Sequence, residues 1–285
     1  METIGDAFNI IVNTLKIILE ENEAKHQAWL LINFLKNYSR DELLINQNEK
    51  LTSKEKLFIA QSLEKLKKSE PIQYVLGRTS FMELPIIVNK SVLIPRPETE
   101  ELVEWIVSEI GGKKMSVLDI GTGSGCIACS IKKYAHNANV EAWDISKNAL
   151  KTAKMNAKLN NVQIKFKQID ILNYHYNNKE EFDVIISNPP YVTEKEKTFI
   201  QPNVLNYEPH SAIFVPNEKP LLFYEKIIEF SHTVLKSGGH LFFEINQLFG
   251  NDIVNLLKYN DFENIELRKD ISGRDRMVKA KLKKC

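Results

Sequence analysis

The amino-terminal quarter of the chain shows only the helical spacing of apolar residues. Between Phe8 and Leu19, apolar side chains recur three or four positions apart on an otherwise polar segment, and residues 24–38 repeat the pattern. The last helix runs to the helix-stopping Pro71. Two capping boxes mark helix starts within this region: Ser39 with Glu42, and Thr52 with Glu55. We predict a small helical bundle over residues 1–78.

The pattern changes after this bundle. Prolines punctuate residues 79–97, and the stretch from Leu84 to Leu93 is rich in β-branched residues, which predicts a linker with a short β-hairpin. From residue 98 on, short apolar runs alternate with amphipathic helices such as Ser146–Leu159, a pattern typical of a mainly parallel sheet with helices on both faces. Five strands are expected there: Ser116–Ile120, Val140–Trp143, Ile164–Lys167, Asp183–Ser187 and His240–Ile245.

The end of the chain departs from this alternation. Ile265–Arg268 and Met277–Leu282 are two strand-like runs with Gly273 and no helix between them, so they should close the sheet as an antiparallel pair. The sequence therefore predicts an α/β domain over residues 98–285 with a seven-stranded, Rossmann-like sheet.

Charge and composition exclude several classes of protein. The 285 residues carry a net charge of +1, and residues 1–80 hold 11 basic and 11 acidic side chains, which argues against a broad cationic surface for nucleic acid. Three cysteines, Cys126, Cys129 and Cys285, suit a reducing compartment. Glu2 and Asp6 stand where a signal peptide would be cationic. We expect a cytoplasmic monomer that binds neither a membrane nor nucleic acid directly.

A glycine-rich loop follows the first strand of the α/β domain. Asp119-Ile-Gly121-Thr122-Gly123-Ser124-Gly125 opens a helix, and its glycines leave room for a ligand at the carboxyl end of the strand. Dinucleotide folds use a related Gly-x-Gly-x-x-Gly pattern to hold a pyrophosphate. Here position 126 is Cys, and Asp119 would repel a pyrophosphate but attract an ammonium group. The loop therefore favours S-adenosylmethionine, with a plain tight turn as the alternative.

Two further acids end neighbouring strands. Asp144 closes the second strand, where a carboxylate can accept both hydroxyls of an adenosine ribose. The alternative is an N-cap for the helix that begins at Ser146. Asp170 ends the third strand, where it could accept the exocyclic amine of adenine or simply hold a surface turn.

The tetrapeptide Asn188-Pro189-Pro190-Tyr191 indicates the reaction. It follows an apolar strand, so it should hang at the carboxyl edge of the sheet beside the glycine-rich loop. Prolines donate no amide hydrogen and stiffen the backbone, which leaves their carbonyls as fixed acceptors. The Asn188 side-chain oxygen and a proline carbonyl could each accept one N–H of a planar amide or aromatic amine and stabilise the charge that develops during methyl transfer. Tyr191 offers a ring face to the substrate or the sulfonium.

Together these motifs resemble the release factor glutamine methyltransferase family, also called HemK or PrmC. Besides the glycine-rich loop and Asn-Pro-Pro-Tyr, the resemblance rests on Ile94-Pro95-Arg96-Pro97-Glu98-Thr99-Glu100, and it covers nearly the whole chain. It implies transfer of a methyl group from S-adenosylmethionine to N5 of the glutamine in the Gly-Gly-Gln tip of class 1 peptide chain release factors. It also implies a methyltransferase sheet and a substrate-recognising helical domain.

The resemblance assigns roles to particular residues. Gly121–Gly125, Asp144 and Asn188 would contact the cofactor, and Asn188–Tyr191 the substrate glutamine. Arg96 is a further candidate for substrate binding. The product expected from the cofactor is S-adenosylhomocysteine. Family members often carry Trp after the third-strand acid, where this chain has Ile171, and Glu244-Ile-Asn246 replaces the more usual Glu-Ile-Gly. Asp170 and Ile171 complete the cofactor candidates.

Two other functions stay open at this point. DNA adenine methyltransferases share Asn-Pro-Pro-Tyr and flip a base into the pocket, so a nucleic-acid adenine or guanine N-methyltransferase is one alternative. A cofactor-binding scaffold without catalysis is another. Cys126 and Cys129 form a Cys-x-x-Cys pair, but with no further ligands nearby they are expected to pack a helix against the sheet and to hold no metal.

Overall fold

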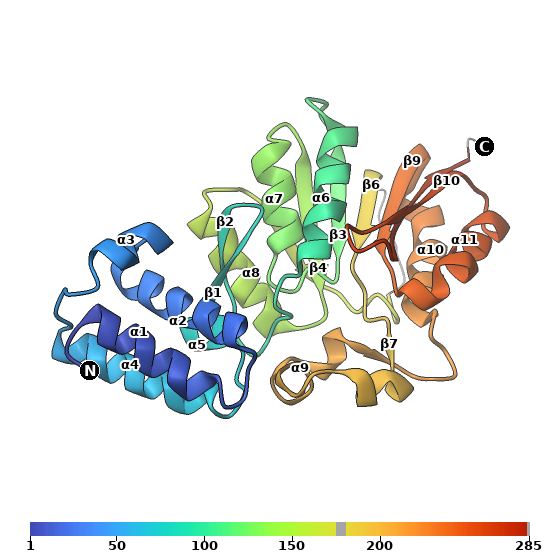
Figure 1. Cartoon of the computed structure of the whole chain (residues 1–285). Coiled ribbons are helices and arrows are strands. Elements are labelled where there is room, and N and C mark those ends of the chain that lie inside the picture. Colours follow the sequence, from blue (N-terminus) through green and yellow to red (C-terminus); the bar gives the residue numbers. More distant parts are fainter. Residues whose placement is uncertain (175–180, 284–285) are drawn as a thin grey trace. The chain divides into compact units, whose positions relative to one another are not determined.

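The computed structural model describes residues 1–174 and 181–283, so Cys285 lies outside the described residues (Figure 1). The chain forms two compact units. The first comprises Met1–Gly77 together with Gln201–Tyr207, and the second comprises Arg78–Ile200 and the residues from Glu208 onward. Within the described residues, no helix is long and apolar enough to cross a membrane.

The first unit is a bundle of helices, of which α1 to α5 are drawn in blue and cyan in Figure 1 and α9 in orange. The predicted capping boxes at Ser39 and Thr52 are both formed, and Thr3 with Asp6 makes another. The helix expected to reach Pro71 ends at Leu66 instead, because the chain turns into the left-handed region at Ser69 (φ 61°). The helices are α1 (Ile4–Leu15), α2 (Glu21–Lys36), α3 (Arg40–Ile45), α4 (Ser53–Leu66), α5 (Ile72–Leu76) and, from later in the chain, α9 (Pro202–Tyr207).

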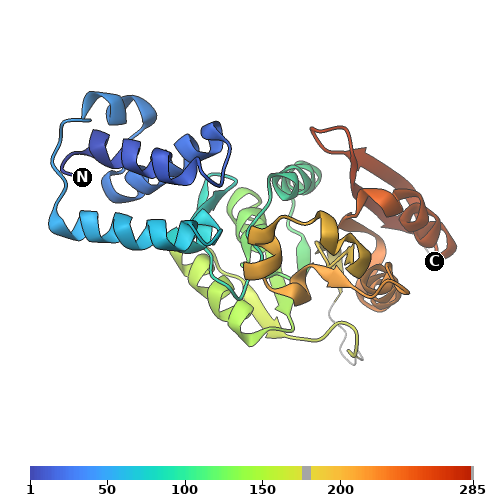
Figure 2. The same ribbon diagram turned by 60° about the horizontal axis from the view of Figure 1, so that its bottom comes forward.

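A seven-stranded sheet forms the centre of the second unit, as predicted. Its order is β10-β11-β9-β6-β3-β4-β5. β9, β6, β3, β4 and β5 pair in parallel, whereas β11 runs antiparallel to both of its neighbours, so the predicted closing pair is confirmed (Figure 2). The strands are β3 (Ser116–Ile120), β4 (Asn139–Asp144), β5 (Lys165–Gln168), β6 (Phe182–Ser187), β9 (Leu235–Glu244), β10 (Phe262–Lys269) and β11 (Asp275–Leu282).

Helices cover both faces of this sheet, because the side chains of each strand alternate between the faces. On β9, Phe242 meets Trp105 of α6 edge to face, while the next residue, Phe243, meets Tyr224 of α10. α6 (Pro97–Ile110), α7 (Cys126–Tyr134) and α8 (Lys147–Leu159) lie on one face. α10 (Leu222–Val234) and α11 (Gly250–Tyr259) lie on the other.

A short antiparallel hairpin, β1 (Arg78–Phe81) with β2 (Leu84–Ile87), belongs to the second unit. Buried Asn156 of α8 holds it by accepting from the amide of Ile87 and donating to its carbonyl. The β-branched run predicted to extend to Leu93 leaves the strand at Ile87, since the Asn89 side chain accepts from the Ser91 amide and turns the chain. Smaller elements follow β6: β7 (Val192–Thr193), β8 (Phe214–Val215) and the 3₁₀ turns η1 (Glu194–Phe199), η2 (His210–Ala212) and η3 (Gln247–Phe249).

Strand register determines what gathers at the carboxyl edge of the sheet. Ile120 of β3 is level with Trp143 of β4 and with Ser187 of β6, and Ser187 is level with Phe243 of β9. The residue after each of these therefore lies at the same height, at the carboxyl edge of the sheet. Those residues are Gly121, Asp144, Asn188 and Glu244.

Candidate active site

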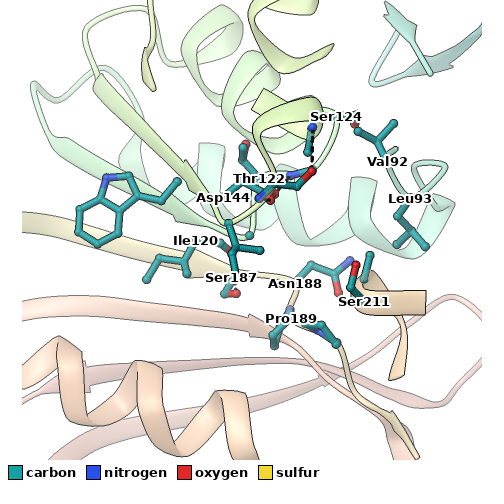
Figure 3. A pocket seen from close by; sticks show the side chains of 18 of the residues that line it. Val92, Leu93, Ile120, Thr122, Ser124, Asp144, Ser187, Asn188, Pro189 and Ser211 are labelled. Atoms are coloured by element: carbon teal, nitrogen blue, oxygen red, sulfur yellow. Dashed lines mark hydrogen bonds between the residues drawn. The ribbon is translucent and has the colours of Figure 1, made fainter. Parts of the chain in front are cut away.

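A cavity of about 430 Å³ opens at this edge, within the second unit. It collects most of the residues that the sequence predicts for cofactor and substrate (Figure 3). In Figure 3, Asn188 and Pro189 lie on one side of the cavity and Thr122 and Ser124 on another. The predicted residues that line it are Arg96, Gly121, Thr122, Gly123, Ser124, Asp144, Asp170, Ile171, Asn188, Pro189 and Pro190.

The glycine-rich loop has the conformation that its composition predicts. Gly121, Gly123 and Gly125 have φ angles of 75°, 55° and 79°, in the region that favours glycine. A Cβ at Gly121 would meet nothing within 4 Å, so this position leaves open space beside the loop. At Gly125 a Cβ would lie 2.9 Å from the Cβ of Ala153, so this glycine lets α7 approach α8.

Asp144 lines the cavity with both carboxylate oxygens in use. Oδ2 accepts from the amide of Gly123 and Oδ1 from the amide of Ser146, each at 2.8 Å. The N-cap of α8 is Ser146, whose hydroxyl accepts from the amide of Ala149. Burial raises the pKa of Asp144. Each oxygen retains a second lone pair, so the carboxylate can still accept hydrogen bonds from a ligand.

Asp119 lies beneath the loop and is not among the residues that line the cavity. Its side chain is fully buried; Oδ2 accepts from the Thr122 hydroxyl at 2.6 Å, and Oδ1 has no hydrogen-bond partner. Burial, helped by the nearby Asp144, raises the pKa of Asp119 to about 7. The structure shows Asp119 supporting the loop through Thr122, and it does not bring the carboxylate to the wall of the cavity.

Asn188, Pro189 and Pro190 form one wall of the cavity. The Asn188 side-chain amino group donates to the Thr99 hydroxyl at 3.3 Å, so Nδ2 points to α6. The prolines carry no N–H, so the backbone of this wall presents only carbonyl acceptors at these two positions. The geometry is that of an acceptor surface beside the glycine-rich loop.

Tyr191 lies behind this wall and packs against the core of the second unit. Its hydroxyl donates to Glu244 Oε1 at 3.0 Å, and the other oxygen, Oε2, accepts from Thr99 at 2.6 Å. Burial raises the pKa of Tyr191, which keeps the hydroxyl protonated. The side chain of Asn246, at the position that departs from the family pattern, donates to the Tyr191 carbonyl at 3.1 Å.

Arg96 lines the cavity and is held from behind by a buried acid. Its guanidinium donates to Glu208 Oε1 at 2.6 Å, and Oε2 accepts from the amide of Ile94 at 3.1 Å. The side chain of Glu208 is 1% exposed and that of Arg96 is 32% exposed. This contact ties the Ile-Pro-Arg-Pro segment to the residues that follow Glu208.

The other predicted residues have mixed surroundings. Asp170 lines the cavity while its carboxylate also accepts from the Leu172 amide and the Asn173 side chain, so it holds a turn at the same time. Cys126 and Cys129 are free and buried, and burial raises the pKa of each thiol to about 12. Within residues 1–174 and 181–283, no group of His, Cys, Asp and Glu could hold a metal ion.

Several residues of the site have no role predicted from the sequence. Glu244 ends a parallel strand just as Asp144 does, and that shared position was an available signal. Thr99 sits in the first turn of α6, inside a motif that was recognised as a whole. Glu208 and the wall residues Ser211 and Ala212 could not be found this way, because they follow no regular strand.

Comparison with known proteins assigns the chain to a family. A release factor glutamine methyltransferase of Flavobacterium psychrophilum is 46% identical over 94% of this chain and 95% of the relative. One of Bacteroides thetaiotaomicron is 46% identical over 76% of this chain and 77% of the relative. The chain belongs to the release factor glutamine methyltransferase family. Family models agree, with a PrmC N-terminal domain at residues 12–77 and a methyltransferase small domain at residues 98–206.

Solved structures support the fold of this family member. A methyltransferase of Pyrococcus furiosus aligns with a TM-score of 0.53 at 18% identity, over 82% of this chain and 100% of that one. A 16S rRNA N2 G1207 methyltransferase of T. thermophilus, in complex with AdoMet and guanosine, aligns with a TM-score of 0.52 at 15% identity, over 72% and 50%.

The residues of the cavity fit S-adenosylmethionine, the cofactor of this methyltransferase family. Gly121 leaves space beside the loop, and the glycine backbone allows close approach. The Asp144 carboxylate has lone pairs to spare for hydroxyl groups, and Ile171 and Trp143 give apolar surface to the same cavity. Together these residues suit the ribose and the adenine ring.

Proposed function

We propose that this protein transfers a methyl group from S-adenosylmethionine to N5 of the glutamine in the Gly-Gly-Gln motif of class 1 peptide chain release factors. The observation that carries the proposal is the shared cavity, in which Asn188, Pro189 and Pro190 face the same space as the glycine-rich loop and Asp144. The names of the relatives support the choice of a release factor glutamine as substrate.

The chemistry follows from the acceptor wall. The nitrogen of a carboxamide is a poor nucleophile because its lone pair is delocalised, and it carries two N–H donors. The side-chain oxygen of Asn188 and a proline carbonyl accept these donors, orient the nitrogen and stabilise the positive charge that develops on it. The cofactor, when bound, supplies an electrophilic methyl group on its sulfonium. No general base is required before transfer, since the proton can leave afterwards.

We assign recognition of the release factor to the helical unit. Leu44 and Ile45 of α3 and Leu57 of α4 are 65%, 78% and 59% exposed, and such side chains suit contact with a protein. Replacing Leu44 and Ile45 by serine should raise KM for the release factor and leave kcat unchanged. An equal KM would contradict this assignment.

The same proposal gives the setting of the reaction. A protein substrate and two free, buried cysteines suit the cytoplasm, and direct binding of nucleic acid is not needed. We expect the enzyme to work as a monomer. Sedimentation at working concentration measures this state.

The central test measures the intact mass of a release factor before and after incubation with enzyme and S-adenosylmethionine. One added methyl, mapped by fragmentation to the Gly-Gly-Gln glutamine, is expected. Transfer to DNA alone would overturn the proposal, and transfer to neither substrate would favour a scaffold. Asn188→Ala should lose turnover by about 10²-fold or more while it keeps most of its cofactor affinity. The control Asn137→Ala removes an exposed carboxamide far from the cavity and should behave as wild type.

A further inference from the structure

We propose that Glu244, acting through Thr99, is a positioning residue that sets which end of the Asn188 carboxamide faces the substrate. The inference rests on the proposed function, in which the Asn188 oxygen accepts an N–H from glutamine. It adds two residues to the site and gives each a role that depends on the direction of its hydrogen bond.

The three side chains form a chain of hydrogen bonds behind the acceptor wall. Asn188 Nδ2 lies 3.3 Å from Thr99 Oγ1, and Thr99 Oγ1 lies 2.6 Å from Glu244 Oε2. They come from three different elements: the residue after β6, the first turn of α6 and the end of β9. Thr99 is 2% exposed and Glu244 is 1% exposed, so water does not compete freely for these groups.

The direction of each bond follows from the chemistry of its partners. An ionised carboxylate only accepts, so the Thr99 hydroxyl must donate its one hydrogen to Glu244. Thr99 can then offer only a lone pair to Asn188, and only the amino group of the carboxamide can use that lone pair. The Asn188 oxygen is consequently the atom left for the cavity. This is the orientation that accepts an N–H from the substrate.

The ionised state of Glu244 follows from what surrounds its two oxygens. Each oxygen receives a hydroxyl hydrogen, from Thr99 and from Tyr191. Burial raises the pKa of Glu244, while these two donors and the charge of Arg276 oppose that rise. The two hydroxyl groups within hydrogen-bond distance and the nearby Arg276 charge favour the ionised form, which is the premise for the directions given above.

Glu244→Gln keeps the shape of the side chain but should reverse the chain of hydrogen bonds. The glutamine oxygen can accept from only one of the two hydroxyls. If it accepts from Thr99, the buried Tyr191 hydroxyl is left without an acceptor. If it accepts from Tyr191, its amino group donates to Thr99, whose hydrogen then turns to Asn188 and pulls the Asn188 oxygen away from the cavity. A buried donor without an acceptor shifts such a balance by roughly ten- to a hundredfold, so the reversed arrangement should dominate.

The experiment compares variants in the release factor methylation assay. Glu244→Gln should lower kcat at least about tenfold and leave the Kd for S-adenosylmethionine within about twofold of wild type. Thr99→Val removes the directing hydroxyl and should give a smaller fall in kcat, which Thr99→Ser restores. The matched control is Thr152→Val, because Thr152 is 3% exposed, its hydroxyl accepts from Asn89 Nδ2 at 2.9 Å, and it is not among the residues that line the cavity.

A further measurement distinguishes reversed hydrogen bonds from a loss of protein stability. A release factor with glutamate in place of the Gly-Gly-Gln glutamine presents an acceptor instead of a donor. It should therefore inhibit methylation of the normal release factor more strongly with Glu244→Gln than with wild-type enzyme. A purely structural defect would weaken binding of the glutamine-bearing and the glutamate-bearing release factor alike. If Glu244→Gln folds and keeps the kcat of wild type, the inference is overturned. If Glu244→Gln does not fold, a wild-type kcat in Thr99→Val overturns it. Wild type that leaves the release factor unmethylated overturns the proposed function itself.

Discussion

Replacing Asp119 by asparagine should change how the stability of the fold depends on pH. The Asp119 carboxyl is fully buried beneath the glycine-rich loop, and only one of its oxygens has a partner. Burial raises its pKa from the ordinary 3.8 to about 7. Asparagine has the same shape, keeps an oxygen for the Thr122 hydroxyl and does not ionise. The comparison therefore isolates the proton.

The sign follows from where the proton is bound. Below pH 3.8 the carboxyl is protonated in both the folded and the unfolded chain. As the pH rises from there, the unfolded chain releases the proton while the folded chain keeps it, so the folded state loses stability until about pH 7. Above that pH the carboxyl is ionised in both the folded and the unfolded chain, and the loss of folding stability stays constant. At about 1.4 kcal/mol per pH unit, wild type should lose about 3 kcal/mol relative to Asp119→Asn between about pH 5 and pH 7.

Urea unfolding of both cofactor-free proteins at several pH values measures this difference. Asp270→Asn is the matched control, because hydrogen bonds and Arg276 hold the pKa of the Asp270 carboxyl below its usual value despite burial. Asp270 is then ionised in both states from about pH 5 upward, so its variant should differ from wild type by a constant amount. A wild-type minus Asp119→Asn difference that is flat between about pH 5 and pH 8 would refute the reasoning.

Three further changes test the scaffold of the site. Gly125→Ala places a Cβ 2.9 Å from that of Ala153 at a φ of 79°, so we expect a loss of about 2 kcal/mol or more by chemical denaturation, and wild-type stability would contradict that close approach. Asn156→Ala leaves three backbone groups, the amide and carbonyl of Ile87 and the carbonyl of Ser124, without their side-chain partner and should destabilise by about 3 kcal/mol, with faster hydrogen exchange in the β1–β2 hairpin. Glu208→Gln should cost about 2 kcal/mol and raise KM for the release factor, because Arg96 loses its charged partner; an unchanged KM would separate Arg96 from substrate binding.

Local patterns in the sequence were sufficient for much of the fold. The capping boxes at Ser39 and Thr52, the five parallel strands and the closing pair were predicted because each depends on residues a few positions apart. The carboxyl edge of a parallel sheet then brings Gly121, Asp144 and Asn188 together whatever the details of packing. The acceptor wall and the glycine-rich loop could therefore be located from the sequence alone.

Tertiary structure decided what lies behind those residues. Glu208 meets Arg96 across 112 positions of sequence, and Thr99 meets Glu244 across 145, so neither contact leaves a local pattern. The depth at which Asp119 is buried was likewise set by tertiary packing, and its carboxyl is not part of the cavity wall. Sequence determined which chemical groups reach the edge of the sheet, because strand periodicity is local; only the packed structure fixed their hydrogen-bond partners, because those come from distant parts of the chain.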